Sequence, residues 1–410
     1  MGHIVSLLIV GEAAFEARSE ITTMEGDMSI ARRILFSTIA SYMAISAVHA
    51  QETIKLGVNL PLTGAVAASG NFVANGVKVA AEEINANGGV LGKKLELIIE
   101  DNKSNPTEAS NVTEKLIVRD KVAVIQGAWG STFTLAAMPK LMEYKVPMVV
   151  DIASSTKVTT AGNPYVFRVA PTNLMEAQNF APHIKNLGIR KADFLVVNND
   201  WGLNGVEAFG KVLRENGVEV GQVQTMDPSA QDMSSQLAVI KASDGDTLFI
   251  TGSVEQAMLI MKQMQALGIE RRVVTSGGAM PDQLIAQAGS AADGTYHIML
   301  FVPWFPEATP NAEAAKKFVK SWEEHGFDPY GMPEGARAYV GTHVIARAIE
   351  RAGAVEPEAI RKALWETDFD TLTGHIAFSK EGPQGKESGQ AHPISYLVQI
   401  DNGEIKLVEE

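Results

Sequence analysis

Short apolar, β-rich runs alternate with amphipathic helical patterns along the chain from about residue 53 onward. The first run, residues 54–60, precedes a helical stripe that starts near Val73 and closes at Asn87-Gly88-Gly89. Continuous apolar strands separated by helices are typical of parallel sheets covered on both faces. The alternation therefore predicts an α/β fold made of doubly wound parallel sheets.

The pattern occurs twice, which predicts two lobes. Strands are expected at residues 54–60, 94–101, 122–127 and 147–151, and again at 193–198, 218–225, 247–251 and 272–275. Helices in the second set are expected at residues 203–216, 232–242 and 255–267. A chain of 410 residues is long enough for two or three cores.

The last third of the chain is too short in regular patterns to form a third lobe. It shows one long helical pattern at residues 334–353 and strand-like segments at 376–379 and 394–400. We therefore assign this last third of the chain to the first two lobes, which it reaches through further crossings between them. The first crossing is expected near residues 167–171. The expected division is residues 51–169 with 299–372 in lobe 1, and residues 170–298 with 373–410 in lobe 2.

The N-terminal region has the pattern of a secretory signal peptide. After Met28 come two arginines, a largely apolar run at residues 34–48, and the small-x-small sequence Val48-His49-Ala50. We interpret residues 28–50 as a cleaved signal peptide and residues 1–27 as a spurious extension of the reading frame. The expected location of the mature protein is the periplasm.

Composition excludes several classes of function. The net charge of −13 disfavours a nucleic-acid partner, which needs a basic face. Because the chain has no cysteine, it cannot form disulfides, thiolate metal sites or a lipid-anchored N-terminal cysteine.

The chain has no complete catalytic or phosphate-binding motif among those sought. Residues 205–211 match GxxxxGK, but Val212 stands where a magnesium-binding Ser or Thr is needed. No GxSxG, GxGxxG or HExxH sequence occurs, so we expect no enzyme, no cofactor and no metal.

Ligands of doubly wound sheets bind beyond the carboxyl ends of the strands. Those ends carry mostly small, hydroxyl-bearing or aromatic residues here, and the candidate ligand-binding residues are Trp129, Gly130, Ser131, Thr132, Ala153, Ser154, Ser155, Asp200, Trp201, Ser253 and Gly277. Small residues let backbone N–H groups at helix N-termini reach a carboxylate. Each Ser or Thr could instead be a helix N-cap, and each Trp could be packing.

Longer segments resemble a known family. INANGGVLGKKLEL, GAWGST, NNDWGLNG and EGARAYVGTHVIARAIERAG are similar to the periplasmic leucine/isoleucine/valine-binding protein family, the type I solute-binding components of ABC importers. The resemblance covers nearly all of residues 53–400. It implies two lobes joined by three crossings, one small ligand between them, no catalysis, and ABC permease subunits in the membrane as partners. We expect a monomer.

The resemblance also implies roles for single residues. Ser131 would bind the α-carboxylate of a ligand, Ala153 and Ser154 would follow in the next loop, and Trp201 would be the aromatic residue that closes over the ligand. The acid that pairs with the ammonium group of an amino acid would fall near Gly277, where there is no charge.

The missing acid leaves the ligand class open. A buried ammonium without a counter-charge would lose several kcal/mol. Either Asp200 replaces the acid, or the ligand is an aromatic or aliphatic acid or amide held between Trp129 and Trp201. Arg337 could contact a ligand carboxylate or be a solvated helix cation. A ligand-sensing module of the same fold, acting on a regulator or receptor, is the alternative to a transport component.

Overall fold

The computed structural model describes residues 53–278 and 280–409. The predicted signal peptide and N-terminal extension therefore lie outside the described residues. Thr53 to Glu410 form one compact unit. Within the described ranges, no helix has both the length and the apolar character needed to cross a membrane.

The first lobe contains a seven-stranded sheet. Its strands are β1 (Thr53–Leu60), β2 (Lys94–Asp101), β3 (Ile125–Gly127), β4 (Met148–Val150), β5 (Val166–Arg168), β13 (Ser379–Glu381) and β14 (Ser388–Gln390), in the order β13-β14-β5-β4-β3-β1-β2. Only the β13–β14 pair is antiparallel. A β11–β12 hairpin (Asp368–Thr371 and Gly374–Ala377) and the short α6 (Lys157–Thr160) complete this lobe.

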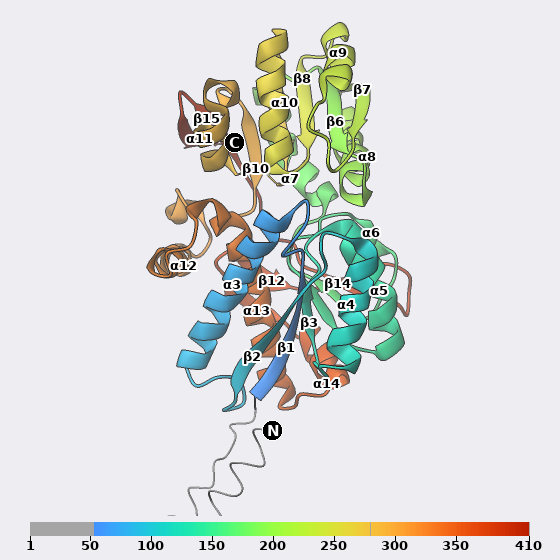
Figure 1. The fold of residues 1–410 in the computed structure, drawn as a ribbon, viewed down its shortest axis with the longest axis vertical. Helices are drawn as coiled ribbons and strands as arrows, with labels where there is room; N and C mark the ends of the chain where they lie inside the picture. The colour runs from blue at the N-terminus through green and yellow to red at the C-terminus, as the bar shows by residue number, and fades with distance from the viewer. Residues whose placement is uncertain (1–52, 279, 410) are drawn as a thin grey trace, which may run out of the picture. The chain divides into compact units, whose positions relative to one another are not determined.

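Helices cover both faces of this sheet. One core cluster joins it to α3 (Ala67–Ala86), α12 (Ala312–Glu324), α13 (Met332–Ala352) and α14 (Pro357–Leu364). A second cluster joins it to α4 (Pro106–Val118) and α5 (Ser131–Tyr144). Figure 1 shows α3 and α13 on one side of the strands and α4 and α5 on the other.

The second lobe repeats this plan. Its strands are β6 (Lys191–Val197), β7 (Glu219–Met226), β8 (Thr247–Thr251), β9 (Arg272–Ser276), β10 (Tyr296–Met299), β15 (Tyr396–Asp401) and β16 (Glu404–Leu407), in the order β16-β15-β10-β9-β8-β6-β7. One face packs on α7 (Asn173–Asn186) and α8 (Asp200–Glu215). The other packs on α9 (Ser234–Ala242), α10 (Val254–Leu267) and α11 (Pro281–Ala288). The predicted doubly wound α/β fold is thus confirmed.

The chain crosses between the sheets three times, after β5, after β10 and after β14. The expected boundary at residue 373 is wrong, because β13 and β14 belong to the first sheet and only β15 and β16 to the second. The physical reason is that β14 pairs in parallel with β5 and so satisfies the backbone groups of a strand that would otherwise be an unpaired edge. Helices α12 and α14 and strands β5 and β10 were also not predicted.

Local sequence signals explain several helix starts. The Asn105 side chain accepts hydrogen bonds from the N–H groups of Thr107 and Glu108, and Pro106 follows it at the first helical position of α4. Ser253 and Gln256 form a capping box at the start of α10. Such caps place the helix N-termini directly after the strands, at the edge of each sheet where the candidate site lies.

Close packing of α3 on α13 depends on glycine. A Cβ at Gly76 would lie 2.1 Å from the carbonyl oxygen of Gly335, and a Cβ at Gly335 would lie 2.1 Å from the ring of Trp322. The two helix backbones therefore touch where any side chain would separate them. This contact fixes the position of the first turns of α13, which carry Glu334 and Arg337.

Candidate functional site

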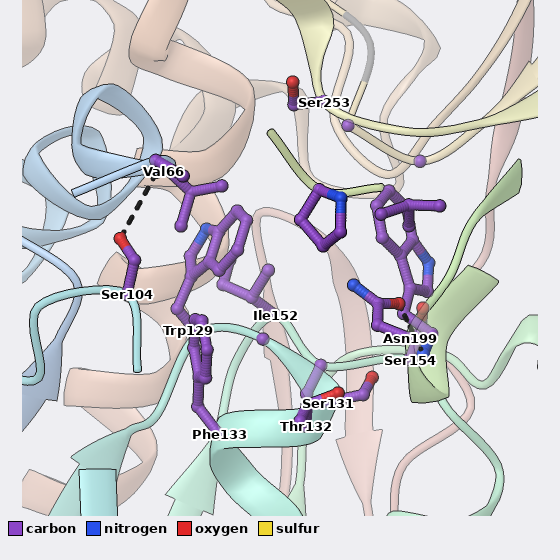
Figure 2. A pocket seen from close by; sticks show the side chains of 18 of the residues that line it. Val66, Ser104, Trp129, Ser131, Thr132, Phe133, Ile152, Ser154, Asn199 and Ser253 are labelled. Carbon is purple, nitrogen blue, oxygen red and sulfur yellow. Dashed lines mark hydrogen bonds between the residues drawn. The ribbon is translucent and has the colours of Figure 1, made fainter. Parts of the chain in front are cut away.

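A cavity of about 330 Å³ lies among loops from the carboxyl ends of both sheets. This volume is at the lower end of the usual range for small-molecule sites. Figure 2 shows Val66 and Trp129 on one side of the space, Asn199 and Ser154 on the other, and Ser131 and Thr132 below Ser253. Most of its lining surface is apolar.

The β3–α5 loop builds one wall. Trp129 has a left-handed φ of 67°, which turns the chain sharply between strand and helix. Gly130 is the N-cap of α5 and offers no side-chain cap. The first N–H groups of α5 consequently have no side-chain acceptor from the cap, and residues 130–133 all line the cavity. The positive end of this helix is suited to a carboxylate.

Ser131 connects this loop to the loop after β4. Its Oγ accepts a hydrogen bond from the backbone N–H of Ser155 at 3.1 Å, and its side chain is almost fully buried. Ser131 lines the cavity, whereas Ser155 does not. The hydroxyl therefore fixes one loop against the other and still reaches the cavity wall.

Arg168 holds the same loop from beneath. Its guanidinium donates to the carbonyl oxygens of Ala153 (3.0 Å) and Ser155 (2.7 Å), to Thr159 Oγ1 (2.8 Å) and to Gln390 Oε1 (2.7 Å). The side chain is completely buried, and burial lowers its pKa to about 9, so it stays charged at neutral pH. Because both carbonyls turn toward Arg168, the cavity face of the loop is left to Ala153 and Ser154.

Trp201 forms part of the opposite wall, in the second lobe. It follows Asn199, whose side chain caps α8 by accepting from the N–H groups of Trp201 and Gly202. A Cβ at Gly277 would lie 3.1 Å from the Trp201 ring, and Gly277 has a φ of 68°. The position near which an acid was expected is therefore filled by the indole of Trp201.

Hydrogen bonds link the two lobes beside the cavity. Thr132 Oγ1 donates to Asp200 Oδ2 at 2.9 Å, and Lys157 Nζ lies 3.8 Å from the other oxygen of Asp200. The backbone N–H of Thr156 donates to Asn204 Oδ1 at 2.9 Å. Asp200 does not line the cavity, so in this structure it acts between the lobes and does not replace the missing acid within the site.

Two other acids, which the sequence did not indicate, do line the cavity. Glu176 lies on α7 and Glu334 on α13, and each is only 3% exposed. Burial raises the pKa of Glu176 to about 7, although the positive charges of Arg337 and Arg168 act to lower it. Burial also raises the pKa of Glu334, although the charge of Arg337 and a hydrogen bond with Trp129 act to lower it. Arg337 Nη2 lies 3.9 Å from Glu334 Oε1.

Two of these buried polar atoms, Glu176 Oε2 and Arg337 Nε, make no hydrogen bond with any described residue. Buried polar groups in proteins are almost always paired. The cavity therefore has an unpaired acceptor and an unpaired donor beside its apolar walls. This lining suits a ligand that itself has both donors and acceptors.

The structure brings most of the predicted site residues together. The predicted residues that line the cavity are Trp129, Gly130, Ser131, Thr132, Ala153, Ser154, Trp201, Ser253, Gly277 and Arg337. Ser253 is also the N-cap of α10, so its hydroxyl caps the helix at the edge of the cavity. No group of three or more His, Asp or Glu side chains among residues 53–278 and 280–409 is placed to bind a metal ion.

Sequence patterns that could have revealed the two acids were present. Glu176 falls on the buried stripe of α7 with Asn173, Ala177 and Phe180, where a charge is out of place. Glu334 is three residues before Arg337, a spacing that puts both on one helix face. Neither pattern shows that the two helices meet at one cavity.

Replacing Ser131 by Ala tests the loop contact. We expect the Ser131→Ala variant to bind its solute about 10-fold or more weakly, because a buried N–H loses its acceptor and the cavity wall loses a hydroxyl. Titration calorimetry measures the change, with Ser235→Ala on the exposed face of α9 as the control. Equal affinities for the two variants would contradict a role for Ser131 in the site.

The chain is similar to known proteins in both sequence and structure. Residues 53–404 match the family described as periplasmic binding protein. The leucine-, isoleucine-, valine-, threonine- and alanine-binding protein of Pseudomonas aeruginosa is 26% identical over 364 residues, which is 87% of this chain and 94% of that protein. The chain is thus similar to a curated binding protein over nearly its whole described length.

Two solved structures show the same fold with different ligand classes in their names. A leucine-binding protein of Thermotoga maritima has a TM-score of 0.77 and 29% identity, covering 87% of this chain and 98% of its own. A solute-binding protein of an ABC transporter from Rhodopseudomonas palustris, in complex with 3,4-dihydroxybenzoic acid, has a TM-score of 0.75 and 25% identity, covering 87% and 96%. Similarity of the whole fold therefore does not distinguish a binding site for an amino acid from one for an aromatic acid.

Proposed function

Because the chain belongs to the periplasmic binding protein family, a family of binding proteins and not of enzymes, we propose that it is the extracytoplasmic solute-binding component of an ABC importer. Its solute is a small organic carboxylate, captured between the lobes and presented to permease subunits in the membrane. Export depends on the signal peptide expected at residues 28–50.

One observation carries the proposal. Loops from both sheets line a single cavity, and the N-terminus of α5 opens onto it beside two tryptophans. A solute held there touches both lobes at once, so its binding free energy favours the conformation in which the lobes are together. The bonds from Thr132 to Asp200 and from Thr156 to Asn204 stabilise the same conformation.

Titration calorimetry with the mature protein tests the proposal. The panel consists of L-leucine, L-isoleucine, L-valine, L-phenylalanine, benzoate and 4-hydroxybenzoate. We expect one-to-one binding of at least one of these carboxylates, accompanied by a change in tryptophan fluorescence because Trp129 and Trp201 line the cavity. A folded protein that binds none of them would overturn the proposal.

A further inference from the structure

Gln390 joins two of the three crossings between the lobes. It is the last residue of β14, its side chain is completely buried, and the third crossing begins at the next residue, Ala391. Its Nε2 donates to the carbonyl oxygen of Ala170 in the first crossing at 2.8 Å and to that of Ala391 at 2.6 Å. One amide group therefore binds the backbone of both crossings, and it lies outside the lining of the cavity.

The backbone alone cannot make this connection. Strands β14 and β5 pair in parallel, and the N–H of Ala391 continues their ladder by donating to the carbonyl oxygen of Arg168 at 2.9 Å. Donors in such a ladder come from every second residue, so the carbonyl of Ala170 would next require the N–H of residue 393. Residue 393 is proline, which has no N–H. The side-chain amide of Gln390 supplies the donor that the third crossing lacks.

The oxygen of the same amide connects the crossings to the cavity. Gln390 Oε1 accepts hydrogen bonds from Arg168 Nε at 2.7 Å and from Thr159 Oγ1 at 3.2 Å. Arg168 in turn holds the carbonyl oxygens of Ala153 and Ser155, in the loop after β4 that borders the cavity. Buried hydrogen bonds therefore run without a break from the cavity loop to two of the crossings.

We infer that Gln390 is a positioning residue of the hinge: it clasps the first and third crossings together and so raises solute affinity without touching the solute. The clasp stabilises the arrangement in which loops of both lobes line one cavity. A backbone ladder would hold the crossings rigidly, whereas an amide on a rotatable side chain can release them when the lobes part. The inference rests on the proposed function, because it assumes that the lobes close around a solute.

A residue that acts through the hinge has a recognisable effect on affinity. The apparent affinity falls in proportion to the fraction of molecules whose lobes are together, whatever the solute is. Loss of the clasp should therefore weaken every solute by the same factor. A residue of the cavity lining changes the ratio of affinities instead, because it contacts the parts in which the solutes differ.

Two variants of Gln390 test the inference by titration calorimetry with L-leucine, L-phenylalanine, benzoate and 4-hydroxybenzoate. Gln390→Met removes every hydrogen bond of the amide, whereas Gln390→Glu keeps the acceptor for Arg168 and loses both donors to the crossings. We expect each variant to weaken every solute that binds by one common factor of at least about 5-fold. Unchanged affinity in both variants, or a changed ratio between solutes, overturns the inference.

Asn163→Leu is the matched control for loss of a buried amide. Asn163 is only 3% exposed, and its side chain donates to the carbonyl oxygen of Met138 at 2.8 Å and accepts from the N–H of Tyr165 at 3.1 Å. It precedes β5, so it lies at the end of that strand opposite the first crossing. The control should lose unfolding free energy, as Gln390→Met does, but keep the solute affinity of the unchanged protein.

Interlobe distances give a readout that needs no solute. Because the chain has no cysteine, Asn111→Cys on α4 and Ser235→Cys on α9 can be spin-labelled specifically, and both positions are exposed. These helices follow β2 and β7, the edge strands farthest in each sheet from β14 and β15, so parting of the lobes about the crossings should separate the labels.

Pulsed electron paramagnetic resonance of the solute-free protein measures these distances. We expect longer distances to gain population in Gln390→Met and not in Asn163→Leu. Equal distributions in these two variants, or a shift to shorter distances in Gln390→Met, overturn the inference. Failure of the unchanged protein to bind any of the solutes counts against the proposed function, and the distances then decide whether Gln390 clasps the crossings.

Discussion

The Arg168→Met variant should lose about 3–5 kcal/mol of unfolding free energy. Methionine has a similar length but no donors, so the Ala153 and Ser155 carbonyls would each lose a buried hydrogen bond. The Thr159 hydroxyl and the Gln390 amide oxygen would also lose Arg168 and keep the hydrogen bond between them. Urea denaturation followed by circular dichroism measures the loss. The unfolding free energy of Arg168→Lys should lie between those of the unchanged protein and Arg168→Met. The reason is that lysine keeps the charge of arginine but not its planar set of donors.

The matched control is Arg119→Met, at an arginine whose side chain is 65% exposed and pairs only with surface acids. Its unfolding free energy should change little, because solvent screens the ion pairs of an exposed side chain. Arg168 also orients the loop at Ala153 and Ser154, so whatever Arg168→Met protein remains folded should bind its solute more weakly. If the urea midpoints of Arg168→Met and Arg119→Met were equal, the buried hydrogen bonds of Arg168 would contribute little to stability.

The Gly76→Ala variant should be destabilised by about 1–3 kcal/mol, although alanine is the better helix former. The new methyl group would lie 2.1 Å from the Gly335 carbonyl oxygen, and Gly335 is itself held against Trp322. Helix α13 must then move away from α3. Because α13 carries Glu334 and Arg337, the same substitution should also weaken solute binding.

Gly210→Ala is the matched control for this prediction, since it makes the same change inside α8. Its Cβ would meet nothing closer than the Arg214 side chain at 3.4 Å. The control should be neutral or more stable by up to about 1 kcal/mol. If thermal or urea unfolding shifted in the same direction and by the same amount in both variants, the close contact of α3 and α13 would not be the limiting feature.

The two variants act on different parts of the cavity lining in the first lobe. Arg168 fixes the loop after β4, which lies beside the N-terminus of α5, whereas Gly76 fixes the helix that carries Glu334. Comparing the solute affinity of both variants would separate the contribution of this loop from that of α13.

Much of the fold could be predicted from the chain. Strands at residues 94–101 and 247–251 coincide with β2 and β8. Strand β8 is buried along its whole length, as expected for an inner strand of a parallel sheet, whereas β2 is an edge strand that mixes apolar and charged residues. The predictions failed where the elements are short or polar. Strands β13 and β14 have three residues each and depend on pairing with β5, a contact far away in the sequence.

The candidate site was predictable at the β3–α5 loop and not at Glu176 and Glu334. Trp129 to Thr132 follow a strand and begin a helix, so their place at the sheet edge follows from local patterns. Asp200 follows a strand in the same way, but its side chain turns to Thr132 and Lys157. Which way a side chain at a strand end points is decided by the partners that packing brings near it.

Residues close together in the chain are enough to specify the two α/β lobes, the helix starts at the strand ends and the loop that contains Ser131. Long-range packing is what places Trp201 against Gly277 and brings Glu176 on α7 to the same cavity as Glu334 on α13. Trp201 and Gly277 are 76 positions apart, and Glu176 and Glu334 are 158 positions apart. The raised pKa values of the two acids arise from shared burial, which no local pattern of residues can specify.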